Sequence, residues 1–242
     1  MIRNFFYRQL HRISVWLLAV SWVVLGIING EIAKLAENPV AGALSWPMGT
    51  EFFIRIWVAL SVALLVSSEF NSESLKCVIV SGRKRKSFFF SELFSTVILA
   101  SLFIIVGYGV GFLCSKGLYA QAFGTSYFLY ELEMFVIHFC IIVVCFAIGV
   151  SVKNKLLAAL IGPVVIYAEM FVDHILKTEF FEFYANSPVK DYMLTGIAKR
   201  SYDLAFLGKA DIRFFLGVVL VSTIISAVAV IFALYRFEKE EC

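Results

Sequence analysis

The sequence predicts an all-α integral membrane protein with six membrane-crossing helices, and three observations lead to this fold class. Of the 242 residues, 61% are hydrophobic and only 16% are charged, so a soluble domain of this size would expose too much apolar surface. The apolar residues gather in segments of about 20, the length that a membrane-crossing helix needs. The charged residues are concentrated between these segments.

Six apolar segments meet this length requirement. The second carries Arg55 near its outer end, with Glu51 one turn earlier as a candidate partner. The fifth contains Pro163, so we expect this helix to be bent or short. No linker or repeat divides the chain, and residues 1–242 are therefore treated as a single transmembrane domain. The expected spans are Ile13–Asn29, Thr50–Ser67, Ser87–Cys114, Phe128–Val152, Leu156–Ile175 and Phe214–Tyr235.

The basic residues of the short loops predict the orientation, because cytoplasmic loops carry an excess of lysine and arginine. Such residues are frequent before the first span, between spans two and three, between spans four and five, and after span six. The short stretches on the other side offer only Lys34, Arg55 and Lys116. Both termini are therefore expected in the cytoplasm, and the long loop from about Leu176 to Arg213 is expected outside.

Two segments outside the spans have helical patterns. In the N-terminal tail, Ile2, Phe5, Phe6 and Leu10 fall near one helical face, which predicts a helix lying in the cytoplasmic membrane interface. A disordered basic tail is the alternative. In the outer loop, Tyr192–Leu207 mixes apolar and charged residues, and we expect short extracellular helices between spans five and six.

Catalytic and metal-binding motifs are missing from the sequence. The chain has three histidines and no H-E-x-x-H motif, and we expect neither catalytic residues nor a metal site. No G-x-x-x-x-G-K-[ST] phosphate loop occurs, so ATP-driven work would need an ATPase on another chain. A nucleic-acid partner is not expected, because no basic face remains outside the membrane-flanking loops.

The tetrad Val106–Gly109 matches the filter sequence of potassium channels, in which backbone carbonyls bind the ion. Here it lies inside a continuous apolar run without a separate pore loop. Gly107 and Gly111 form a G-x-x-x-G pair, which permits two helices to pack closely. We therefore predict that these glycines pack against a neighbouring helix.

Three ionisable residues fall within or at the end of apolar spans, where such groups are costly and often functional. His138 lies in span four, and Glu169 and Asp173 are one helical turn apart near the outer end of span five. They could form the proton or cation relay of an ion-coupled secondary transporter. The interpretation that we favour is that they face an outer vestibule or the interface.

The polar segment between spans two and three has a distinctive pattern. An acidic-aromatic pair, Glu69-Phe70, ends span two, and the amphipathic stretch Glu73–Lys76 follows. Ser81–Arg83 then leads into the aromatic start of span three, Phe88–Phe90. This pattern resembles the permease subunits of type-2 ABC exporters, especially the small bacteriocin and lantibiotic immunity permeases. The chain departs from them at Glu73-Ser74, where they often have Gly-Thr, and at Glu92, where they often have lysine.

The resemblance implies a cytoplasmic coupling helix between spans two and three that docks onto a cytoplasmic ABC ATPase. It implies ATP and Mg²⁺ on that partner, a second permease (identical or homologous), surrounding membrane lipid and a location in the bacterial plasma membrane. The implied function is export of an amphipathic peptide or another hydrophobic substrate. An ion-coupled secondary transporter and a non-transporting membrane scaffold are the alternatives. Arg83–Lys86 either touch the ATPase or bind anionic lipid. The implied docking residues are Glu69, Asn71, Glu73, Leu75, Lys76 and Arg83.

Overall fold

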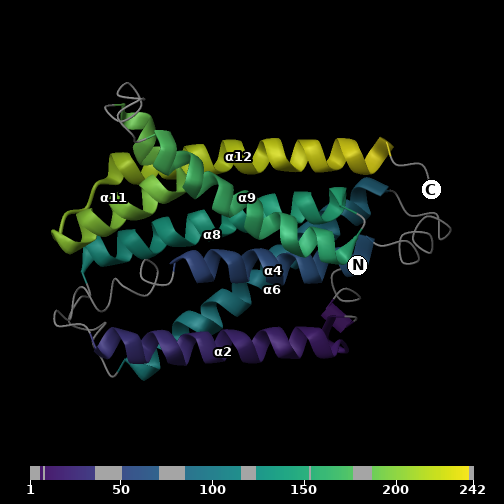
Figure 1. Ribbon diagram of the computed structural model, residues 1–242, viewed down its shortest axis with the longest axis horizontal. Coiled ribbons are helices and arrows are strands. Elements are labelled where there is room, and N and C mark those ends of the chain that lie inside the picture. Colours follow the sequence, from purple (N-terminus) through teal and green to yellow (C-terminus); the bar gives the residue numbers. More distant parts are fainter. Residues whose placement is uncertain are drawn as a thin grey trace.

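The computed structural model describes residues 6, 7, 9–35, 51–70, 85–115, 124–152, 154–176 and 187–239. Within these residues the chain forms helices and short connections and contains no strand. The predicted all-α fold class is therefore confirmed. The long helices lie roughly alongside one another in one bundle (Figure 1).

Six long helices correspond to the six predicted spans. Five of them, all except α4, are long and apolar enough to cross a membrane. The uninterrupted apolar stretch of α4 covers Ile54–Val66 and is shorter, so the sixth crossing stays a prediction. The elements are α2 (Ile13–Lys34), α4 (Glu51–Phe70), α6 (Arg85–Cys114), α8 (Thr125–Ser151), α9 (Lys155–Leu176), the short 3-10 helix η2 (Pro188–Tyr192), α11 (Leu194–Phe206) and α12 (Ile212–Lys239).

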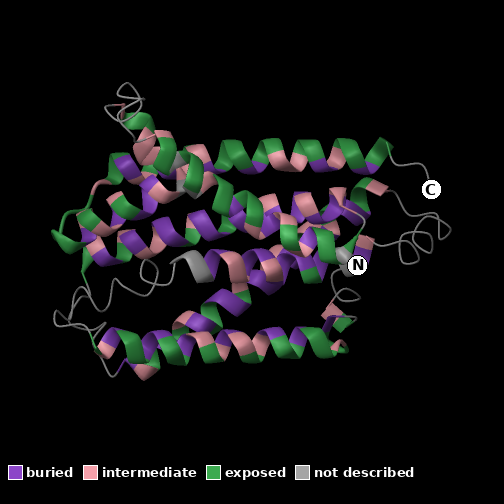
Figure 2. Ribbon diagram, in the orientation of Figure 1, coloured by how far each residue is buried: buried purple, intermediate pink, exposed green. Residues whose placement is uncertain are grey.

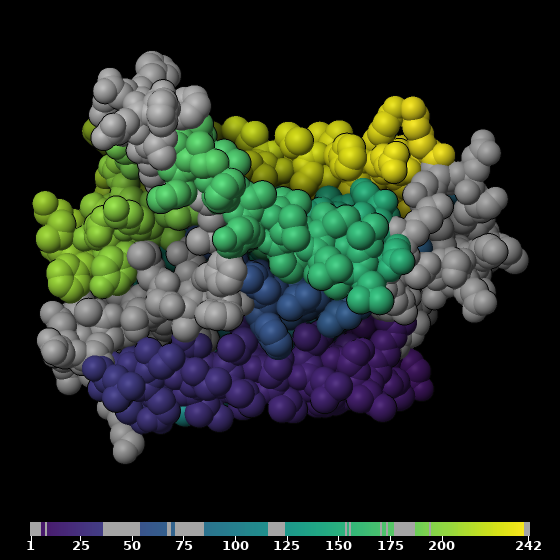
Figure 3. All heavy atoms as spheres, viewed as in Figure 1, coloured from purple at the N-terminus to yellow at the C-terminus, as the bar shows by residue number. Residues whose placement is uncertain are grey.

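Helix α4 forms the centre of the bundle together with α8. It packs mainly against α8 and α9, while α12 packs on α8 and α2 packs on α6. Buried residues follow α4 and α8, whereas long stretches of α2, α9 and α12 are exposed (Figure 2). On the face shown in Figure 3, α9 and α2 flank a narrow visible strip of α4. The buried apolar residues of α4 are Ile54, Val58, Ala59, Val62, Ala63, Leu65 and Val66.

Glycines bring α2 and α6 close together. A methyl group added at Gly26 would lie 2.5 Å from the backbone oxygen of Gly107, and one added at Gly30 would lie 2.8 Å from that of Gly111. The predicted packing role of Gly107 and Gly111 is confirmed. The filter-like tetrad is part of the continuous helix α6, whereas a filter needs non-helical backbone lined by protein.

The connection from α9 to α12 contains the short helices that the sequence predicted. Helix η2 begins at Pro188, and α11 follows and packs against α8 and α9. A side chain at Gly196 would collide with the backbone oxygen of Lys190, so glycine permits α11 to fold back onto η2. Helix α9 continues through Pro163 as one element, and the expected shortening does not occur.

The N-terminal segment and the end of α12 lie at the same end of the bundle (Figure 1). Phe6, Tyr7, Gln9 and Leu10 are helical, and the backbone becomes extended at Arg12 before α2 begins. The predicted N-terminal helix is therefore supported for these residues, while residues 1–5 and Arg8 lie outside the described part. At this end the ammonium of Lys86 lies 3.1 Å from the carboxylate of Glu238.

Candidate functional site

The end of α4 is fixed by a buried carboxylate. Glu69 is 1% exposed, and its Oε1 accepts a hydrogen bond of 3.0 Å from Nε2 of Gln9. The same oxygen lies 3.0 Å from a guanidinium nitrogen of Arg12, whose side chain is 30% exposed. Gln9 is also buried, and it lies 3.4 Å from the backbone oxygen of Leu65. The predicted docking residue Glu69 therefore points inward and contacts the N-terminal segment. We call its contacts with Gln9 and Arg12 the Glu69 junction.

Aromatic rings join four helices beside this junction. Phe70, at the end of α4, has its ring centroid 5.5 Å from that of Phe88 in α6 and 5.7 Å from that of Phe146 in α8. The Phe70 ring also lies 5.5 Å from that of Phe237 in α12. Phe89 of α6 contacts the rings of Phe146 and Phe237. We call these five residues the aromatic cluster. The end of α4 and the start of α6 thus lie side by side.

The remaining docking residues implied by the resemblance lie between these two points. They fall within residues 71–84, outside the part of the chain that the structure describes. Their positions stay predictions. The described residues on both sides of this segment pack against each other at one end of the bundle. These residues are Asn71, Glu73, Leu75, Lys76 and Arg83.

A second group of polar residues lies inside the bundle, toward the end opposite the termini. Arg55 of α4 is 1% exposed, and it interacts electrostatically with Glu169 of α9 and with His138 of α8. Two of the predicted intramembrane residues are thus linked through one arginine. Sequence reasoning noted Arg55 with Glu51 as a candidate partner; that pairing stays a prediction, because the Glu51 side chain is outside the described part.

Glu169 is also joined to α11. Its Oε2 accepts a hydrogen bond of 3.1 Å from the hydroxyl of Thr195, and its Oε1 lies 3.4 Å from the backbone nitrogen of the same residue. Thr195 stands in the first turn of α11, where the unpaired N–H groups and the helix dipole favour a carboxylate. The third predicted residue, Asp173, lies one turn further along α9, and its side chain is outside the described part.

A pocket of about 310 Å³ lies between α6 and α8. His138 lines it, and the His138 ring centroid is 6.4 Å from that of Tyr108. Glu131 also lines it and interacts through its side chain with Tyr127, one turn earlier. Sequence reasoning missed Glu131 and the nearby buried Glu133, although two carboxylates in the first turns of an apolar span are a recognisable signal. The pocket is lined by Ile104, Ile105, Tyr108, Phe128, Glu131, Leu132, Phe135 and His138.

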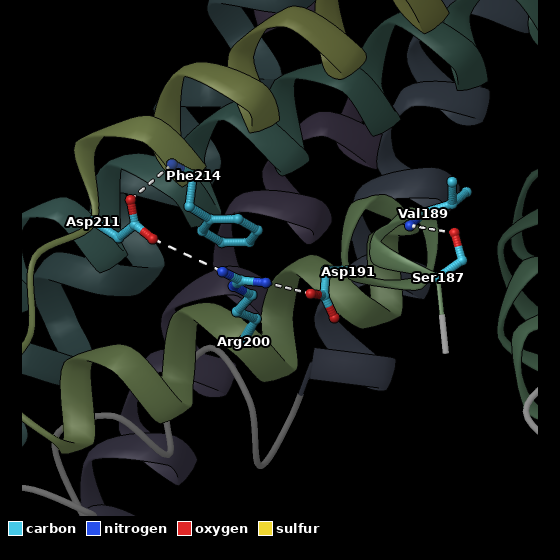
Figure 4. A network of polar contacts seen from close by, with 6 residues as sticks. All are labelled: Ser187, Val189, Asp191, Arg200, Asp211 and Phe214. Carbon is cyan, nitrogen blue, oxygen red and sulfur yellow. Dashed lines mark hydrogen bonds and ion pairs between the residues drawn. The ribbon is translucent and has the colours of Figure 1, made fainter. Parts of the chain in front are cut away.

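Helices η2 and α11 are tied to α12 by one arginine. Arg200 of α11 forms ion pairs with Asp191 of η2 and, at 3.8 Å, with Asp211 (Figure 4). Its guanidinium carbon lies 4.7 Å from the ring centroid of Phe214. Asp211 accepts a hydrogen bond of 3.0 Å from the backbone nitrogen of Phe214 and so caps the start of α12. We call this arrangement the Arg200 latch. It is separate from the predicted site residues.

A larger apolar groove of about 720 Å³ runs between α6, α8 and α12. Two hydroxyl side chains of α12 lie among otherwise apolar residues. The groove contains none of the predicted site residues. It is lined by Phe90, Leu93, Phe94, Val97, Phe139, Val143, Thr223, Ser226, Ala227, Val230 and Ile231.

Within the described residues, no group of three or more His, Cys, Asp or Glu side chains is placed to hold a metal ion. Several described ionisable groups instead join one element to another, as Glu69 and Arg200 do. The function therefore has to be argued from these contacts, since no protein-family model matches the chain and no curated protein matches it either.

Proposed function

We propose that this chain is the transmembrane subunit of an ATP-driven exporter of the type-2 ABC class, which its sequence resembles. A separate cytoplasmic ATPase with its ATP and Mg²⁺ would drive it, and a second permease, identical or homologous, would complete the pathway. The observation that carries the proposal is the packing of the two helix ends that flank residues 71–84 in the sequence. The contacts of Glu69 with Gln9 and Arg12 fix the end of α4, and the aromatic cluster joins it to the start of α6; we call this arrangement the packed base.

This base provides a mechanical route from a docked partner to the membrane helices. A force on residues 71–84 would act first on the end of α4 and the start of α6, where Phe70 and Phe89 pack against rings of α8 and α12. It acts equally on α4, which is buried between α8 and α9. Because packed interfaces transmit displacement rather than absorb it, ATP-driven movement at the partner would reach the whole bundle.

The apolar groove between α6, α8 and α12 supports a hydrophobic or amphipathic substrate. Its lining is almost entirely apolar, and about 720 Å³ falls in the usual size range of ligand pockets. Thr223 and Ser226 supply the few polar contacts there. An amphipathic peptide could lay its apolar side in this groove while still in contact with lipid, before export out of the membrane.

The decisive experiment is a pull-down in mild detergent with the full chain as bait. The test variant is Glu73→Arg/Leu75→Asp in the proposed docking segment. The control is Glu31→Arg, which changes an exposed carboxylate near the far end of α2. We expect the wild type and the control to recover an ATPase that carries a phosphate-binding loop, and the test variant to lose it. Recovery of no ATPase by a folded wild-type bait contradicts the proposal.

The second candidate is an ion-coupled secondary transporter, favoured by the buried group of Arg55, Glu169 and His138. This function predicts substrate flux in proteoliposomes without any ATPase, and loss of flux when the ion gradient is collapsed. It also predicts loss of flux on Glu169→Gln. A non-transporting scaffold, by contrast, would bind its partner and support no flux under either condition.

A further inference from the structure

The pocket between α6 and α8 contains a carboxylate whose charge is not matched. Two arginines at this end have acidic partners: Arg55 interacts with Glu169, and Arg200 pairs with Asp191 and Asp211. Within the described part of the chain, no cationic side chain forms an ion pair with Glu131.

The unmatched charge leaves a hydrogen-bonding position open. The Oε1 atom of Glu131 is buried and accepts no hydrogen bond from the described residues. Tyr127 is the one side chain that the described structure gives it as a hydrogen-bond partner. A buried carboxylate oxygen without a donor is costly, so a ligand that brings both a positive charge and N–H donors would be stabilised there.

The rest of the pocket is suited to the body of such a ligand. Phe128, Phe135 and Tyr108 line it, and aromatic faces attract cations as well as apolar groups. His138 stands two helical turns beyond Glu131 on the same helix. At about 310 Å³ the pocket is at the small end of ligand sites, which suits a compact molecule with one ring rather than a peptide.

We propose that this pocket binds a small lipophilic amine, with its ammonium group paired to Glu131 and its apolar body lying between Phe128, Phe135 and Tyr108. The site opens between two helices that are expected to span the membrane, so an amine dissolved in the lipid can reach it. The proposal is independent of the transport function, because binding to this chain requires neither an ATPase nor flux.

The test is equilibrium binding of radiolabelled 2-phenylethylamine to the full chain in lipid nanodiscs. n-Propylbenzene, which has a methyl group where the amine has its ammonium, serves as the neutral competitor. We expect saturable amine binding that n-propylbenzene displaces poorly. Glu131→Gln keeps the side-chain volume and removes the charge, and it should weaken binding at least about tenfold, as expected for loss of a charged hydrogen bond.

Glu133→Gln is the matched control, because Glu133 is also buried in the same helix but does not line the pocket. We expect it to bind like the wild type. Ile105→Trp is the second variant, since Ile105 lines the pocket and is 55% exposed, so a larger side chain can fill the space without repacking the core. It should abolish binding while Glu131 stays in place. Equal binding by Glu131→Gln and the wild type, or equal competition by n-propylbenzene, would overturn the proposal.

Discussion

Removing the Glu69 carboxylate should detach the N-terminal segment from the bundle. In the wild type, Oε1 of Glu69 accepts a hydrogen bond from Nε2 of Gln9 and forms an ion pair with the guanidinium of Arg12, each at 3.0 Å. Glu69→Ala removes both contacts. Gln9 is 1% exposed and would keep a buried amide without this acceptor, whereas Arg12 is 30% exposed and can recover hydration.

The expected loss follows from these exposures. Leaving a buried polar group unsatisfied costs about 1–3 kcal/mol, and a hydrogen bond to a charged group contributes about 1.5–3 kcal/mol. Because Arg12 regains water, we take about 1 kcal/mol for its share and expect Glu69→Ala to lower the free energy of unfolding by about 3 kcal/mol. Glu69→Gln keeps an acceptor for Gln9 and should cost only about 1 kcal/mol.

The assay is reversible unfolding in mixed detergent micelles, with circular dichroism as the measure of the helical content. Limited proteolysis then tests whether the chain becomes cleavable near Tyr7. Glu31→Ala is the control: its carboxylate is paired only with Lys34 on the helix surface, and its loss should change stability by less than about 0.5 kcal/mol. If Glu69→Ala were no more destabilising than Glu31→Ala, or if the N-terminal segment stayed protected, the reasoning would be refuted.

Three further predictions use the same unfolding assay unless another is named. Gly26→Leu should lower the free energy of unfolding by about 1–3 kcal/mol, because its side chain would meet the backbone of α6. Gly109→Leu, with open space around it, should have little effect. Equal losses of stability in the two variants would contradict close packing of α2 on α6. Arg200→Gln should speed hydrogen exchange in α11, since it breaks the latch, whereas exposed Lys199→Gln should not; unchanged exchange would show that the latch is not needed. Glu169→Gln should cost about 1–3 kcal/mol, because it removes a carboxylate that accepts a hydrogen bond from Thr195 and interacts with buried Arg55, and a change below about 0.5 kcal/mol would mean that these contacts contribute little.

The long helices and most of their positions could be predicted, because apolar runs of this length have few other folds. The packing role of Gly107 and Gly111 could also be predicted, since small residues at this spacing leave a smooth helix face. Their partners Gly26 and Gly30 have the same spacing and went unnoticed, because a sequence does not state which two helices meet. Pro163 was expected to bend or shorten α9; the helix is not shortened and continues through the proline, as neighbouring helices in a membrane bundle permit.

The candidate sites were harder to predict, because their residues come from different helices. Glu69 was predicted as a docking residue, and that role stays a prediction; its contact with Gln9, which bridges 60 residues of sequence, could not be predicted. Arg55 and Glu169 were noticed separately and not as a pair. Glu131 was overlooked because the span around it is so apolar that its carboxylate did not change the prediction of a membrane-crossing helix. In each case the chemistry depends on helix packing rather than on local sequence.

The central position of α4 has a consequence for biosynthesis. An arginine within an apolar helix makes membrane insertion less favourable, and Glu169, one carboxylate that interacts with Arg55, lies on α9, which the ribosome makes only after α6 and α8. During that interval the nascent α4 lacks the Glu169 carboxylate and the two helices against which it mainly packs. We therefore expect stable insertion of α4 into the bilayer only after α9 has been made. The helix at the centre of the finished protein would then insert stably later than its position in the sequence suggests.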